Sequence, residues 1–141
     1  MNPATHQWFD GPPALNRRFV IYLPSRKEDG AEIPRLQQLA SGIAGMLSER
    51  FGGATTYPAT GHFGSQREDI LVIECFCGEK AWQASSSYLF SLVKALGAYC
   101  DQEMIACSLD GTMLLVSPHA GDRKSAPPDR SIVESLMVHG H

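Results

Sequence analysis

Three side chains near the middle of the chain have the chemistry of an acid-base or ligand-binding site. His62 and Arg67 lie in the stretch 61–69, together with two carboxylates. Histidine titrates near neutral pH and suits proton transfer, whereas arginine can hold a carboxylate or a phosphate through two parallel hydrogen bonds. Glu74 interrupts the apolar run 70–77, and burial in a dry site would raise the pKa of its carboxyl group, so that it could act as a general base. The sequence thus predicts His62 and Glu74 as catalytic candidates and Arg67 as a ligand-binding residue.

Each of these features also has a plain structural explanation. A polar turn with a surface ion pair accounts for the stretch 61–69, and a sheet face in contact with water accounts for Glu74. His62 is one of five histidines in the chain and the only one inside the region that we predict to fold. The three residues form a catalytic site only if the fold brings them together, so the sequence leaves a binding module and an enzyme as alternatives.

The sequence predicts no metal, no cofactor, no nucleic-acid partner and no membrane partner. Cys75 and Cys77 form a C-x-C pair rather than the C-x-x-C of zinc and redox sites, and we expect four reduced thiols, as is usual in the cytoplasm. The glycine pair at 52–53 follows a helix-period stretch, whereas phosphate-binding loops precede a helix. A formal net charge of -3 gives no electrostatic reason to bind nucleic acid or an anionic membrane.

One pattern occurs twice in the chain: a short apolar run, a stretch with helical periodicity, and a second apolar run. The first copy spans 18–57 and the second spans 69–109. This repeat is typical of the split βαβ arrangement of ferredoxin-like domains. We predict an α+β fold of βαββαβ order, with an antiparallel sheet in the order 4-1-3-2 and both helices on one face. Pro58 cannot donate to a ladder hydrogen bond, so we expect it to interrupt the second strand and to place that strand at an edge.

Two additions to this core are expected at its C-terminal end. The Asp-Gly pair at 110–111 lies between apolar runs and predicts a hairpin, and thus an extra edge strand over 112–116. A capping box at 131–134 begins a short tail helix, whose apolar stripe we expect to dock either on the body of the protein or on a partner. We divide the chain into a flexible arm at 1–16, a ferredoxin-like domain at 17–117, and a linker with the short helix at 118–141.

The predicted sheet leaves one face without helices. The two central strands place Tyr22 and Phe76 on this open face beside Glu74, and both aromatic residues are therefore candidate ligand-binding residues. The stretch 21–23 resembles the first motif of RNA-recognition domains, which stack bases on this face, but their second motif is absent. A large apolar face is a liability in water. The C-terminal tail, the N-terminal arm or a second copy could cover it. A second copy is the most economical cover, because a two-fold axis lets one patch cover itself, and we expect a homodimer.

Several short motifs resemble those of small bacterial ferredoxin-like α+β proteins of unknown function. They are a Phe-Gly-Gly-Ala-Thr turn at 51–55, a Gly-x-aromatic hairpin at 61–63 and an Arg-Glu pair at 67–68. This chain has Phe63 where those proteins lead us to expect tryptophan. The layout is also similar to dimeric α+β barrel proteins, some of which are oxygenases or isomerases while others only bind ligands. The resemblance covers about residues 17–117, implies the fold more than the function, and carries over no catalytic residues.

We therefore predict a small dimeric binding or interaction module, with a small-molecule ligand compatible with this role. The alternative is a small cofactor-free enzyme with an interfacial acid-base site made of His62, Arg67 and Glu74. The first residues, 1–13, lack the basic and apolar regions of a signal peptide, so we expect a cytoplasmic protein. The separation of His62 and Glu74 in space discriminates the two alternatives.

Overall fold

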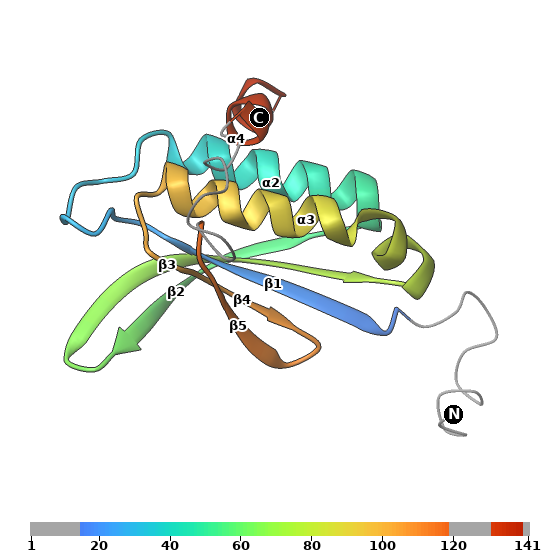
Figure 1. The fold of residues 1–141 in the computed structure, drawn as a ribbon, viewed down its shortest axis with the longest axis horizontal. Helices are drawn as coiled ribbons and strands as arrows, with labels where there is room; N and C mark the ends of the chain where they lie inside the picture. Colours follow the sequence, from blue (N-terminus) through green and yellow to red (C-terminus); the bar gives the residue numbers. More distant parts are fainter. Residues whose placement is uncertain (1–14, 119–130, 140–141) are drawn as a thin grey trace, which may run out of the picture.

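A computed structural model of the protein describes residues 15–118 and 131–139. Helices α2 and α3 lie side by side on one face of a five-stranded sheet, and α4 lies on the outer side of this helix layer (Figure 1). This arrangement confirms the predicted α+β class. Most of the predicted arm at 1–16 and of the predicted linker lies outside the described residues. The elements in chain order are β1 (Arg17–Pro24), α2 (Leu36–Phe51), β2 (Thr55–Phe63), β3 (Gln66–Cys77), α3 (Glu79–Tyr99), β4 (Ile105–Leu109), β5 (Thr112–Val116) and α4 (Ser131–His139).

The sheet has the order β2-β3-β1-β4-β5, and every neighbouring pair is antiparallel. It differs from the four-strand order 4-1-3-2 by β5, which lies outside β4. The tight turn between β4 and β5 holds Asp110 and Gly111 at positive φ angles of 52° and 90°, as the Asp-Gly pair predicts.

Strand β2 lies at the opposite edge, but the predicted interruption at Pro58 is wrong. The strand continues through Pro58, which is paired with Leu71. An edge strand needs ladder hydrogen bonds on one side only, so a proline whose missing N–H would point outward costs it nothing.

The main hydrophobic core lies between the sheet and helices α2 and α3. Alternate residues of β1, namely Phe19, Ile21 and Leu23, face the helices and are at most 1% exposed. Directly opposite on β3 lie Ile73 and Cys75, which belong to the same core. The period of two along these strands therefore selects the side chains that the helices cover.

All four cysteines are free and buried. Burial raises the pKa of Cys75 and of Cys100 to about 12, and the pKa of Cys107 to about 11. Desolvation, the largest cause, also raises the pKa of Cys77. At neutral pH these groups are uncharged thiols, and an uncharged thiol is a poor nucleophile. The expectation of four reduced thiols agrees with this arrangement.

We expect iodoacetamide to modify none of the four cysteines of the native protein within minutes, and all four once guanidinium chloride unfolds it. The reason is that both the accessibility and the thiolate fraction rise on unfolding. Intact-mass spectrometry counts the adducts. Fewer than four adducts on the unfolded, unreduced chain would reveal a disulfide and contradict the structure.

The C-terminal helix α4 docks on its own chain, across α2 and α3. Its side chains Val133 and Met137 are buried in the main core cluster. The Tyr99 hydroxyl lies 3.5 Å from the Met137 sulfur and donates a hydrogen bond of 2.6 Å to the Pro34 carbonyl oxygen. Gly42 of α2 lies against the backbone of α4, since a Cβ atom at this position would be 2.4 Å from the Leu136 carbonyl oxygen. The absence of a side chain at Gly42 thus allows the close approach of the two helices.

Gly42→Ala should therefore destabilise the protein, because overpacking costs about 1–3 kcal/mol, more than the gain in helix propensity of about 1 kcal/mol. Gly45→Ala is the matched control on the same helix, since a Cβ atom there meets nothing within 4 Å, and it should stabilise the protein. Urea denaturation followed by circular dichroism measures both. Equal stabilisation by the two substitutions would show that α4 does not lie on Gly42.

Candidate functional site

His62 and Arg67 lie together at the far end of the β2–β3 hairpin. They are directly opposite each other on the two strands, and both side chains are exposed. Residues paired in this way have Cβ atoms about 5 Å apart. Because Arg67 is an even number of residues from the core residue Ile73 on the same strand, it lies on the helix side of the sheet. The predicted closeness of the histidine and the arginine is present in the structure.

Glu74 lies on the other face of the sheet, away from this pair. It is opposite Val20 of β1 and Thr55 of β2, and seven residues separate it from Arg67 along β3. At about 3.3 Å per residue this separation is about 23 Å. A single chain therefore does not bring Glu74 to His62 and Arg67, and the three residues could share a site only across two chains.

Glu74 has an ionic partner that the sequence analysis missed. The Arg18 Nε atom donates a hydrogen bond of 2.9 Å to Glu74 Oε2, and a terminal nitrogen of the same guanidinium group binds the same oxygen. This hydrogen bond raises the pKa of Arg18. The guanidinium carbon also lies 5.9 Å from the centre of the Phe76 ring. Alternation along β1 places Arg18 on the same face as Tyr22, and this pattern was the only sign in the sequence that Arg18 could pair with Glu74.

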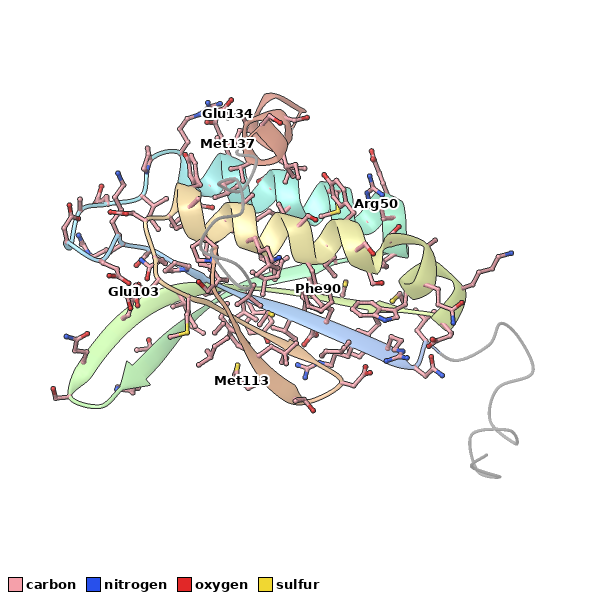
Figure 2. All side chains as sticks on the ribbon, viewed as in Figure 1. Arg50, Phe90, Glu103, Met113, Glu134 and Met137 are labelled. Carbon is pink, nitrogen blue, oxygen red and sulfur yellow. The ribbon has the colours of Figure 1, made fainter. Side chains whose placement is uncertain are left out.

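The rest of the open face is mostly apolar and carries several large exposed side chains. One row of directly paired residues crosses all five strands: Tyr57, Val72, Tyr22, Ala106 and Leu115. Most of the exposed large apolar side chains on the described strands project from this face: Tyr57 (41% exposed), Phe76 (43%), Met113 (55%) and Leu115 (62%). Figure 2 shows Met113 on the side of the sheet remote from the helices. We call this set, with Tyr22 and the Arg18–Glu74 pair, the open face.

Two valines at the centre of the open face are nevertheless buried. Val20 and Val72 are 0% and 3% exposed, although neither belongs to the core cluster under the helices. Alternation along the two central strands predicted Tyr22 and Phe76 on this face. Met113 and Leu115 were not predicted there, although the period of two over 112–116 indicates both.

Arg67 lines a cavity of about 190 Å³ together with Ser25 and Arg26 from the loop after β1, and with Glu68 and Asp69. His62 and Glu74 are not among the residues that line it. Among the described residues, no group of three or more His, Cys, Asp or Glu side chains is placed to hold a metal ion. No helix in the described ranges is long and apolar enough to cross a membrane.

No protein-family model matches the chain, and no curated protein matches its sequence. Among the solved structures with a similar fold are two of a phage SAM lyase. One is a phage SAM lyase in complex with S-methyl-5'-thioadenosine, with a TM-score of 0.55 and 11% sequence identity over 81% of this chain and 98% of that chain. The other is a phage SAM lyase in the apo state, with a TM-score of 0.52 and 12% identity over the same shares. At this level of identity the likeness concerns the fold alone.

Proposed function

We propose that the protein is a self-associating binding module, in which the open face of one chain packs against the open face of a second copy. The observation that carries this proposal is the gathering of Tyr57, Phe76, Met113 and Leu115, all exposed, on one side of the sheet. Five strands at about 4.8 Å spacing and about six residues in length give a face of about 500 Å². A patch of this size on a monomer is often functional.

A second copy is favoured over an unrelated partner by the composition of the open face. Its only ion pair on the described strands, Arg18 with Glu74, is internally neutral, so two copies could meet without bringing unpaired like charges together. Packing around a two-fold axis makes one patch complementary to itself. Covering the face would strengthen the attraction within the ion pair, but the cost of removing water from the two charges offsets this gain.

The candidate ligand-binding residues Tyr22 and Phe76 would then lie at the interface with Glu74. An aromatic ring offers a large, rigid contact surface at a small cost in side-chain entropy. A small ligand held between two copies would contact the same three residues from each chain. In this arrangement the predicted ligand-binding residues of two chains would form one shared site.

Leu115→Glu should shift the protein from dimer to monomer, because a carboxylate without a partner is costly to bury in an apolar interface. Ser91→Glu adds the same charge at an exposed position of α3 and should leave the mass of the assembly unchanged. Light scattering coupled to size exclusion measures the mass, which should be twice the 15.4 kDa of one chain for the wild type. A wild-type mass of one chain at all micromolar concentrations would overturn the proposal and leave another segment or partner as the cover.

A second candidate function is that of a small enzyme acting on SAM, whose sulfonium group is positively charged. The two structures described above are of SAM lyases, and each aligns over 98% of its length. A cation suits the faces of aromatic rings, and the open face combines the rings of Tyr22, Tyr57 and Phe76 with the carboxylate of Glu74. Of the predicted acid-base residues, only Glu74 lies on this face, and Arg18 would have to move from it to admit a cation.

If this enzyme function holds, incubation with SAM should release S-methyl-5'-thioadenosine, detected by liquid chromatography with mass spectrometry. Glu74→Gln should lower the rate about a hundredfold or more, as removal of an acid-base group commonly does, whereas Glu49→Gln on the exposed surface of α2 should not change it. A rate no greater than that of SAM in buffer would remove this candidate and leave the binding module.

A further inference from the structure

A cleft on the helix side of the sheet lies at the base of the β2–β3 hairpin. Strand β1 ends at Pro24, opposite Ile70, whereas β2 and β3 continue together for four more residue pairs. The hairpin therefore extends beyond the helices, while the chain after β1 turns up toward the start of α2 (Figure 1). Between these segments lie a cavity of about 510 Å³ and the adjoining cavity of about 190 Å³, which share the lining residues Ser25 and Asp69.

The two compartments of the cleft differ in chemistry. The larger one has a mostly apolar lining made of Leu36, Pro58, Ala59, Ile70 and Leu71. Its polar lining residues are Gln37 and Thr60, in addition to the shared Ser25 and Asp69. The smaller one brings together cations and anions, Arg26 and Arg67 with Glu68 and Asp69. Its volume and its apolar lining make the larger compartment suitable for a small organic molecule, and the charged compartment would recognise its polar end.

The charged side chains that line the smaller compartment form no ion pairs with one another in the described part of the chain. In the described part of the chain, neither Arg67 nor Asp69 forms an ion pair. Arg26 donates one guanidinium nitrogen to the Gly30 carbonyl oxygen at 3.0 Å, which fixes its loop and leaves its other donors available. Arg67 and Asp69 are two residues apart on the same face of β3, about 7 Å along the strand. A positive and a negative group thus flank one cavity side by side.

We propose that this cleft binds a free α-amino acid with an apolar side chain. The carboxylate would accept hydrogen bonds from Arg67 and Arg26, the ammonium group would donate to Asp69, and the side chain would enter the apolar compartment. A ligand that is only anionic would meet the carboxylates of the cleft, and a ligand that is only cationic would meet the two guanidinium groups. A zwitterion matches both. The cleft lies on the helix side, so association through the open face leaves it accessible.

Isothermal titration calorimetry with L-leucine, L-methionine and L-phenylalanine at millimolar concentration tests the proposal. At least one of them should bind with one molecule per chain. For L-leucine, 4-methylpentanoic acid lacks the ammonium group and 3-methylbutylamine lacks the carboxylate, and each analogue should bind about tenfold or more weakly, because each loses a charge-assisted hydrogen bond. No binding of any of the three amino acids, or equal binding of an analogue, would overturn the proposal.

Two substitutions at exposed positions locate the site. Arg67→Ala and Asp69→Asn should each weaken amino-acid binding about tenfold or more, and circular dichroism should show both variants folded. The matched controls, Arg50→Ala and Glu49→Gln at the opposite end of α2, should bind like the wild type. Wild-type affinity in Arg67→Ala would place any amino acid elsewhere on the protein and contradict the assignment.

Discussion

The handedness of the two crossover connections determines which surfaces of this protein are available. The connection from β1 through α2 to β2 passes over one neighbour, β3, and the connection from β3 through α3 to β4 passes over β1. Such connections are right-handed. Since β1 and β3 run in opposite directions and the two connections move to opposite sides, right-handedness places both helices on the same face. The other face is left without helices, and its side chains must be covered by something else or remain in water.

The same constraint explains the composition of the open face. It holds two buried valines, several larger exposed apolar side chains, and the ion pair of Arg18 with Glu74. An ion pair in such surroundings adds little stability, because desolvation offsets the attraction of the charges. It does fix β1 against β3 in one register, since a shift by one residue would turn Glu74 toward the helices. A polar pair within an apolar face is therefore compatible with a specific protein–protein interface rather than with non-specific hydrophobic association.

Much of the architecture follows from local patterns in the sequence. The periods of two and of 3.6 residues predict the succession of strands and helices, the Asp-Gly pair predicts the turn before β5, and Pro58 indicates an edge strand. These signals depend on neighbours in the chain. The continuation of β2 through Pro58 was missed because a proline is tolerated only according to which way its backbone nitrogen points, and that depends on the pairing register of the strand.

The candidate site was harder to predict, because a site depends on which residues share a face. Arg67 and Glu74 are separated by an odd number of residues along β3, and in a regular strand such residues lie on opposite faces. Counting along the strand was therefore enough to separate them, provided that the strand was known to run without a bulge from Gln66 to Cys77. Counting along one strand could not identify Arg18 as the partner of Glu74, because their proximity depends on the pairing register between β1 and β3.

Strand β3 shows how one segment can serve several surfaces. Its residues Ile73, Cys75 and Cys77 belong to the core under the helices, whereas Glu74 and Phe76, at the alternate positions, belong to the open face. Toward the hairpin the helices no longer cover the strand. On the side of β3 that faces the core farther along the strand, Arg67 and Asp69 line the cleft instead. The change from core to cleft along one face results from strand length alone, since β3 has twelve residues and β1 has eight. The alternation of residues along β3 thus separates the open face from the helix side, and the length of the hairpin leaves room for the cleft on the helix side.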